Sequence, residues 1–449
     1  MLKNRRYFSV LYIVLITLLM VGCKSDSIAS VPEIIDSGED ISIFVATDIH
    51  YLATGLNDHG KAFETYFAAG DGKQLNYVDE IFSSFMLDIE MKKPDILVIS
   101  GDLTNNGEKE SHMNMASKLA NIEKKTGTRV FVIPGNHDIQ NPWARGFQGE
   151  EQYITDSISA NEFANIYNEF GYGEAVVRDE SSLSYLAKPS KDVWLLMLDT
   201  SVYKNNYKYG SPATFGEISE ETYNWIRECS GLAKKSNAKI VTVMHHNLLD
   251  HNMVLNYGFT LDDNEEAIKV FKECGINLVL SGHIHMQDIK STKEESDPIY
   301  DIATSSLAVY PVQYGILKYQ PTQGFDYSTS QVDVEGWAEK VRKKDNNLLN
   351  FIEYNREFFS NTSYQKAYDS LTEVGIYKEE DKKLMAETMS LLNLNYFAGT
   401  TSSVRDRVVK TKGYKLWRKA SEPETLTNYV NSMVYTYGID NDNKLLIPN

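Results

Sequence analysis

The stretch Arg129–Asp138 reads RVFVIPGNHD, a short apolar run that ends in Gly-Asn-His-Asp. An unbroken run of β-branched and aromatic side chains is typical of a strand buried on both faces of a sheet. Similar runs occur at Ile41–Thr47, Asp95–Ser100, Val193–Leu198, Lys239–Met244 and Ile276–Ser281. Helical patterns follow several of them, at Val78–Lys92, Glu110–Lys125, Ser219–Lys235 and Asn264–Glu273. This alternation predicts an α/β layered fold with strands covered by helices.

Side chains that bind hard or borderline metal ions follow five of these runs. They are Asp48-Ile49-His50, Gly101-Asp102, Gly135-Asn136-His137-Asp138, His245-His246 and Gly282-His283-Ile284-His285. The carboxyl ends of strands line the ligand crevice of open α/β sheets, so we expect these groups to converge there. In extended backbone, side chains two residues apart point to the same side. Asp48 and His50 would then point the same way, as would His283 and His285. The three glycines would let the backbone turn into the site without a Cβ clash.

The chemistry of these groups narrows the kind of site. Carboxylates, imidazoles and one amide, without thiolates, suit manganese, iron, zinc or similar divalent ions. Any one of the motifs arises easily by chance, whereas all five in strand context predict a site for two metal ions.

Taken together, the motifs resemble the signature of calcineurin-like metallophosphoesterases, over roughly residues 40–325. Their spacing is most similar to that of the bacterial class III cyclic nucleotide phosphodiesterase branch. The resemblance implies a four-layer α/β/β/α sandwich whose site lies at the strand C-termini. It also implies two divalent ions that share a bridging hydroxide, which attacks phosphorus.

The resemblance also implies a role for each motif residue. Asp48, His50 and His285 would hold one metal, Asn136, His245 and His283 the second, and Asp102 would bridge both. His137 would be the general acid that protonates the leaving group. We expect His246 to line the site or to pack, and Asp138 to orient His137 rather than to bind metal.

Other polar residues lie outside these motifs. His59, His112 and His251 are expected to be surface or loop residues. Candidates for substrate contact are His112, Asn105, Asn106 and the Tyr310-Pro311 segment. Three cysteines are too few for a disulfide scaffold. Export would permit a disulfide between Cys229 and Cys274, but two buried free thiols are the preferred interpretation.

The first 23 residues have the features of a targeting signal. An apolar run of 14 residues, Phe8–Val21, follows a basic start formed by Lys3, Arg5 and Arg6. That run is short for a bilayer span and typical of a signal-peptide core. It ends in Met20-Val21-Gly22-Cys23, which resembles the bacterial lipobox apart from Met20, where leucine is usual. We therefore expect lipidation of Cys23, a tether over residues 24–39, and an extracytoplasmic protein anchored to the bacterial cell membrane; an uncleaved anchor and an ordinary secretory signal are the alternatives.

The pattern changes after Pro311. Two further strands are expected at Val312–Tyr319 and Phe325–Val334. Polar helices then follow at Lys340–Phe358, Asn361–Leu371, Glu379–Leu394, Ser402–Ala420 and Glu424–Tyr437. All nine histidines lie between His50 and His285. We therefore expect a catalytic domain over residues 40–330 and an α-helical domain over residues 331–449 that caps or supports it.

Charge and motifs together define the expected function. The net charge of −17 and the pI of about 5.1 disfavour nucleic acid as a partner and a nuclease as the function. We expect a metal-dependent phosphodiesterase that acts outside the cytoplasm, with cyclic nucleotides among its candidate substrates. A phosphomonoesterase or nucleotidase on the same metal core is the main alternative, and a surface binding protein with a vestigial site is a distant one.

Overall fold

The computed structural model describes residues 34–292, 296–435 and 442–449. The expected signal peptide, Cys23 and most of the tether therefore lie outside the described residues. Residues 36–449 form one compact unit. Among the described residues, no helix has the length and apolarity needed to cross a membrane.

One sheet has six strands in the order β15-β14-β13-β1-β2-β3. Its parallel part consists of β1 (Ile41–Ala46), β2 (Ile96–Ser100) and β3 (Arg129–Ile133). Its antiparallel part consists of β13 (Gln313–Gln320), β14 (Gly324–Gln331) and β15 (Lys444–Pro448). The last strand, β15, returns to this sheet after the helical region, which the sequence pattern did not predict.

The second sheet has seven strands in the order β11-β12-β10-β9-β8-β7-β6. Its parallel centre consists of β8 (Val193–Leu198), β9 (Lys239–Met244), β10 (Leu278–Ser281) and β12 (Tyr300–Ala303). Antiparallel edges are added by β11 (Asp288–Ser291), β7 (Tyr185–Ala187) and β6 (Val177–Arg178). The six strands expected from apolar runs before Pro311 are therefore all present.

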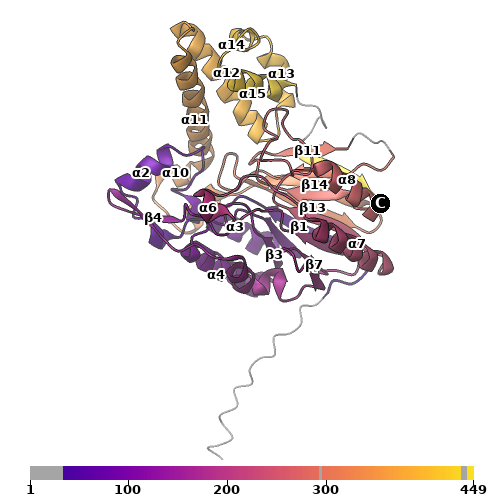
Figure 1. Cartoon of the computed structure of the whole chain (residues 1–449). Helices are drawn as coiled ribbons and strands as arrows, with labels where there is room; N and C mark the ends of the chain where they lie inside the picture. The colour runs from indigo at the N-terminus through magenta and orange to yellow at the C-terminus, as the bar shows by residue number, and fades with distance from the viewer. Residues whose placement is uncertain (1–33, 293–295, 436–441) are drawn as a thin grey trace, which may run out of the picture. The chain divides into compact units, whose positions relative to one another are not determined.

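Helices cover the outer faces of the two sheets (Figure 1). On the first sheet lie α3 (Val78–Lys92), whose Phe85 packs on Tyr314 of β13, and α4 (Lys109–Thr126). On the second lie α7 (Glu220–Lys235) and α8 (Asn264–Cys274), which share one apolar cluster with β8 and β9. Between the sheets, the hydroxyl of Tyr185 on β7 donates to the carbonyl of Val132 on β3. These layers confirm the expected α/β/β/α arrangement.

The C-terminal region is helical, as expected, but several helix boundaries differ. Its helices are α9 (Val334–Lys340), α10 (Asn346–Leu349), α11 (Phe351–Val374), α12 (Glu379–Phe397), α13 (Ser402–Val408), α14 (Lys412–Trp417) and α15 (Glu424–Val434). The single helix expected over Lys340–Phe358 is instead divided among α9, α10 and α11. The 24-residue helix α11 runs through a polar stretch where a break was expected, because Ser360 bonds to Ser390 of α12 beside it (Figure 1). A single helix was expected over Ser402–Ala420, but Thr411 caps a new helix by accepting from Tyr414 N.

Several short elements outside the two large sheets were not expected. They are the 3-10 turn η1 (Thr54–Leu56), α2 (Lys61–Ala68), β4 (Arg145–Gln148), β5 (Glu151–Ile154), α5 (Ala160–Ile166), the π-turn η2 (Asn168–Tyr172) and α6 (Asn206–Tyr209). Elements of three to eight residues carry too few periodic positions to reveal themselves in a sequence.

Candidate metal centre

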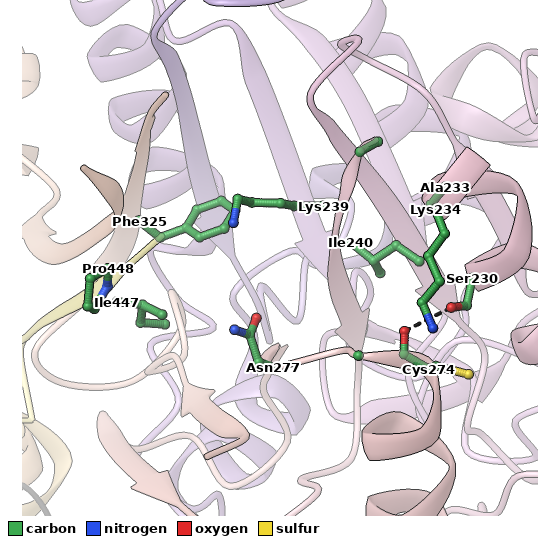
Figure 2. Close-up of a pocket in the computed structure, with 12 residues that line it drawn as sticks. Ser230, Ala233, Lys234, Lys239, Ile240, Cys274, Asn277, Phe325, Ile447 and Pro448 are labelled. Atoms are coloured by element: carbon green, nitrogen blue, oxygen red, sulfur yellow. Dashed lines mark hydrogen bonds between the residues drawn. The ribbon is translucent and has the colours of Figure 1, made fainter. Parts of the chain in front are cut away.

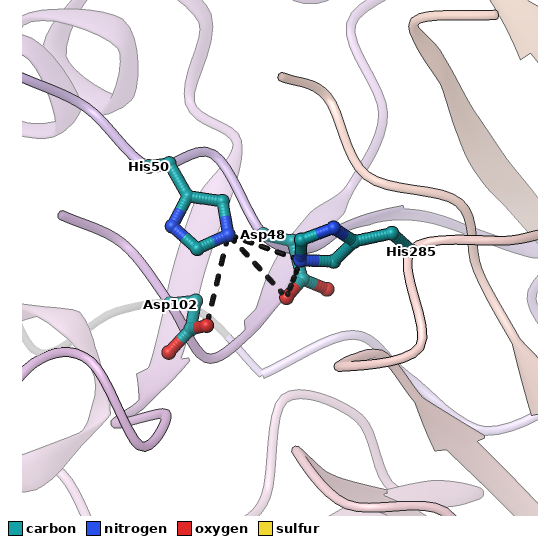
Figure 3. Close-up of side chains that lie close together, drawn as sticks. All are labelled: Asp48, His50, Asp102 and His285. Atoms are coloured by element: carbon teal, nitrogen blue, oxygen red, sulfur yellow. Dashed lines mark hydrogen bonds and ion pairs between the residues drawn. The ribbon is translucent and has the colours of Figure 1, made fainter. Parts of the chain in front are cut away.

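The candidate ligands lie just beyond the carboxyl ends of β1, β2, β3, β9 and β10, where the sequence placed them. Two groups of side chains could each hold an ion: Asp48, His50, Asp102 and His285 form one, and Asp102, His245 and His283 form the other. Within each group the potential ligand atoms lie within 4.8 Å of one another. Figure 3 shows the first group converging on a common point. Because Asp102 belongs to both groups, two adjacent sites share one carboxylate.

The backbone at five of the seven expected ligands is left-handed rather than extended. The φ angle is 50° at Asp48, 48° at His50, 48° at Asp102, 66° at His283 and 62° at His285. The expectation that extended backbone aligns Asp48 with His50 and His283 with His285 was therefore wrong, although their side chains do converge. The backbone must therefore turn as soon as each of these strands ends. A left-handed non-glycine residue costs on the order of 1–3 kcal/mol, and such costs cluster at functional sites.

Three glycines make these turns feasible, as expected; at Gly282, a Cβ would lie 2.7 Å from Oδ2 of Asp48. Gly101 has a φ of 91°, and a Cβ there would lie 2.4 Å from Nδ1 of His245. A Cβ on Gly135 would lie 2.2 Å from Oδ1 of Asp102. Any larger residue would push a ligand out of place.

The first half of the centre brings several lone pairs together. Oδ2 of Asp48 accepts from the backbone N–H of His283, whereas Oδ1 is buried without a hydrogen-bond partner. This Oδ1 lies 3.2 Å from Nε2 of His285. Nε2 of His50 lies 3.1 Å from the same His285 nitrogen and 3.7 Å from Oδ2 of Asp102. A divalent cation would satisfy the unpartnered carboxylate oxygen and these facing nitrogens together.

In the second half of the centre, hydrogen bonds to backbone carbonyls fix which ring nitrogen of each histidine ligand carries the proton. Nδ1 of His245 donates to the Ser100 carbonyl at 2.9 Å, which leaves Nε2 as the lone-pair atom. That Nε2 faces Oδ1 of Asn136 at 3.1 Å and Oδ1 of Asp102 at 3.5 Å. Nε2 of His283 faces the Gly258 carbonyl at 2.7 Å and donates to it, which leaves Nδ1 free to bind a metal. Such hydrogen bonds set the tautomer of metal-binding histidines.

Electrostatics agree with a cation site. Burial alone would raise the pKa of Asp102, but His245 and His137 outweigh it and hold that pKa well below its usual value. Burial would likewise lower the pKa of His245, but Asp102 raises it to about 9. In the protein alone, a proton on His245 therefore compensates the Asp102 charge. The donor set fits two divalent ions and, lacking thiolates, leaves the choice among manganese, iron and zinc open.

His137 lies beside the ligands without belonging to either group. Its ring is 5.0 Å from that of His50, at a right angle. Nδ1 donates to the carbonyl of Asn105 at 2.8 Å and lies 3.2 Å from Oδ1 of Asn106. Burial lowers the pKa of this imidazole to about 4. Nε2 has no hydrogen-bond partner among the described residues and is the atom left for a substrate.

Asp138 and His112 have other positions than expected. The Asp138 carboxylate accepts from the backbone N–H groups of Leu103, Thr104 and Gly135 and does not contact the His137 ring. His112 is buried on α4 and donates from Nε2 to the Asp138 carbonyl at 2.9 Å. Asp138 therefore ties two ligand loops together, and His112 supports it from behind instead of contacting substrate.

Of the expectations for the other histidines, some are confirmed and one is wrong. His59 is exposed, as predicted, but His251 is buried between Asp288 and Asp301, so its expected surface position was wrong. His246 packs, with Nδ1 2.8 Å from the Thr200 hydroxyl.

Three further expectations concern the thiols and the remaining substrate-contact candidates. Cys229 and Cys274 are buried free thiols, as predicted. Asn105 and Asn106 are buried and donate to the Tyr66 hydroxyl, and Tyr310 stacks on Phe359 of α11. Contact of these three with substrate stays a prediction.

Lys73 was missed by the sequence reasoning. Its Nζ lies 3.4 Å from Nδ1 of His50. Only a Gly-Asp-Gly turn precedes it, and such turns are common. Figure 2 shows a different hollow, of about 150 Å³, near the start of β9, where Lys239 and Ile240 lie. Its lining holds no carboxylate and no imidazole, so it is not a second metal centre.

Two family models match this chain, and two relatives and a solved structure are similar to parts of it. The family model described as calcineurin-like phosphoesterase matches residues 41–287, and the model for the C-terminal domain of cyclic nucleotide phosphodiesterase matches residues 333–440. A probable cyclic nucleotide phosphodiesterase of Rhodococcus erythropolis is 23% identical over 43% of this chain, and the match spans about half (52%) of that relative. A 3′,5′-cyclic-nucleotide phosphodiesterase of Nostoc is 24% identical over 55% of this chain and 72% of its own length. A solved dimetal phosphatase from Danio rerio aligns over 65% of this chain and 95% of its own, with 11% identity and a TM-score of 0.47.

Proposed function

The chain belongs to the calcineurin-like phosphoesterase family and is a metal-dependent phosphoester hydrolase, and from that premise we propose that it hydrolyses phosphodiesters, with cyclic nucleotides as the leading class. The match to the C-terminal domain of cyclic nucleotide phosphodiesterase and the two relatives named for that activity support this choice.

The observation that carries the proposal is the fixed orientation of His137. An alkyl diester loses an alkoxide, which leaves readily only when it is protonated. The Asn105 carbonyl holds Nδ1–H, so Nε2 is the nitrogen that holds and delivers a proton. The same carbonyl favours the doubly protonated ring and so opposes the burial that lowers the pKa of His137 to about 4.

The ligand groups have the complementary role. Two divalent ions bound there would polarise the phosphoryl oxygens and lower the pKa of water. Asp102 keeps the two sites adjacent because its carboxylate oxygens face His50 on one side and His245 on the other. The Asp138 carboxylate holds the loop of Asp102 next to the turn at Gly135, because it accepts from the backbone N–H groups of both Leu103 and Gly135.

We also propose that the reaction takes place outside the cytoplasm, with the protein anchored through a lipid on Cys23. The basic, apolar and lipobox-like order of residues 1–23 supports this placement. The test is fractionation of cells that make the full chain or its Cys23→Ser variant. Lipid labelling and membrane recovery lost only in the variant are expected, and equal recovery in the soluble fraction would refute the anchor.

The first experiment on function uses residues 24–449, stripped of metal and reloaded with Mn²⁺. Hydrolysis of bis(p-nitrophenyl) phosphate is compared with that of p-nitrophenyl phosphate, alongside 3′,5′- and 2′,3′-cyclic nucleotides. Preference for diesters is expected. Preference for the monoester would replace the proposal with a phosphomonoesterase or nucleotidase.

A further inference from the structure

Lys73 places a cation next to the metal ligands. It lies in the loop between α2 and α3, half-buried, with Nζ 3.4 Å from Nδ1 of His50. Across the described ranges, this ammonium forms no ion pair with a carboxylate. Asp102, Asp71, Asp48 and Glu108 attract this charge from beyond ion-pair distance, so none of them occupies its hydrogen-bond donors.

The present partner of Lys73 cannot serve in the metal-loaded enzyme. An ammonium has three donors and no acceptor, so it needs a lone pair. Nε2 of His50 faces the ligand group, and a histidine that binds metal through Nε2 carries its proton on Nδ1. A protonated Nδ1 has no lone pair, so it cannot accept a hydrogen bond from the Lys73 ammonium. The ammonium is then available to an anion at the centre, and a phosphoryl oxygen is the acceptor that the reaction supplies.

The loop of Lys73 is held by helix α11 of the C-terminal region. Nε2 of Gln74, next to Lys73 and fully buried, donates to Oδ1 of Asn355 at 3.0 Å. Phe359 packs so closely on Gly72 that a Cβ there would lie 3.0 Å from its ring. At the surface, Lys366 pairs with Asp71 at 2.6 Å. The three residues around Lys73 therefore all depend on one helix.

We propose that Lys73 binds the phosphoryl oxygens of the substrate, and that Asn355 of α11 is a positioning residue that acts through it. This inference rests on phosphoester hydrolysis at the metal centre. It gives the C-terminal helices a direct part in substrate binding.

The first test compares Lys73→Met and Lys73→Arg in the Mn²⁺-loaded protein. Charged hydrogen bonds of this kind change affinity roughly 10- to 100-fold, so Lys73→Met should raise KM for bis(p-nitrophenyl) phosphate and weaken inorganic phosphate binding by that factor. The metal content should stay at the wild-type value, kcat should change little, and Lys73→Arg should recover most of the affinity. Lys61→Met, on the exposed face of α2, is the matched control.

Two outcomes separate this inference from the proposed function. Wild-type KM and phosphate affinity in Lys73→Met would overturn the inference and leave diester hydrolysis intact. A wild type that hydrolyses no diester yet binds phosphate through Lys73 would refute the proposed function and uphold the inference. Phosphate binding is measured calorimetrically, so it does not depend on turnover.

The second test addresses the positioning residue. Asn355→Leu leaves Gln74 unpaired and should raise KM in the same direction as Lys73→Met. The double variant should be no worse than Lys73→Met alone, since Asn355 acts through Lys73. Fully additive losses would overturn the positioning role. Ser363→Ala, which removes a contact with Asn393 of α12 elsewhere on the same helix, is the control and should leave KM unchanged.

Discussion

His285 and Met286 are consecutive in the chain, but their side chains serve different parts of the molecule. Nε2 of His285 lies 3.2 Å from Oδ1 of Asp48 in the metal centre. Met286 is 1% exposed and belongs to the apolar cluster of the C-terminal helices, together with Ile284, Met389 and Trp417. The loop that carries two metal ligands is therefore backed by helices from the other end of the sequence.

Met286→Ala should weaken both folding and metal binding. Truncation of a buried methionine costs about 2–5 kcal/mol, because a cavity replaces its contacts. The loop of His285 would lose its backing, so the affinity for Mn²⁺ should also fall. Thermal unfolding and metal titration measure the two effects. Met253→Ala, at a side chain that is 64% exposed, is the control. Unchanged metal affinity in Met286→Ala would mean that the loop is rigid by itself.

Asp102→Asn should deplete both metal sites at once, because both groups of ligands include this carboxylate. An amide keeps the shape but loses the charge and one lone-pair oxygen. Elemental analysis after equilibration with Mn²⁺ gives the stoichiometry, and Asp326→Asn, at an exposed position of β14, is the control. Full occupancy by two ions in Asp102→Asn would refute the shared carboxylate.

His137→Ala should retain its metals but slow alkyl diesters by about 10²- to 10⁴-fold, the usual contribution of general acid catalysis. Activated aryl esters have good leaving groups and should lose far less. Rates on a cyclic nucleotide and on bis(p-nitrophenyl) phosphate measure the contrast, with the exposed His59→Ala as control. Equal losses on both substrates would rule out proton donation by His137.

The buried His251 should make stability depend on pH. Burial alone would lower its pKa, but Asp301 and Asp288 outweigh burial and raise it to about 9. The folded state thus binds a proton more tightly than the unfolded state, whose histidine pKa is about 6.5. The resulting stability, about 3 kcal/mol, is full below about pH 6.5 and is lost as the pH rises to about 9. The nearby Asp442, with its pKa raised to about 8 mainly by burial and Asp288, acts in the same direction.

Denaturant unfolding from pH 6 to 9 measures this effect. His251→Gln should be less stable at pH 6, because it leaves Asp301 without a positive partner and Asp288 with Lys290 alone. Its free energy of unfolding should fall less steeply with pH than that of the wild type. An identical slope in the two proteins would exclude His251 as its source.

Metal binding should stabilise the fold appreciably. The buried Oδ1 of Asp48 has no hydrogen-bond partner in the protein alone, and the strained ligand turns store further free energy. A hundredfold excess of Mn²⁺ over its Kd should add about 2.7 kcal/mol for each site. The measurement is unfolding with Mn²⁺ and with EDTA, and equal stability in both would show that the sites do not bind it.

The sequence predicted the features that depend on local pattern. Unbroken apolar runs such as Val193–Leu198 identified the strands, and motif spacing identified the residues that converge on Asp102. It failed where a residue's role depends on distant partners. Asp138 and His112 could not be assigned, because the N–H groups and carbonyl that they contact come from other loops. Lys73 was missed because its neighbour His50 is far along the chain and its anchor, α11, further still.

The left-handed backbone at five ligand positions restricts how this centre could change. Aspartate, asparagine, histidine and glycine tolerate that conformation, whereas β-branched and bulky residues do not. Exchange among the tolerated types at Asp48, His50 or His283 alters the charge and hardness of the site while the turn persists. Any other exchange breaks the turn before it alters the chemistry. A designer who seeks a new metal preference therefore has only a few residue types to choose from at these positions. The backbone conformation limits that choice, not the ion.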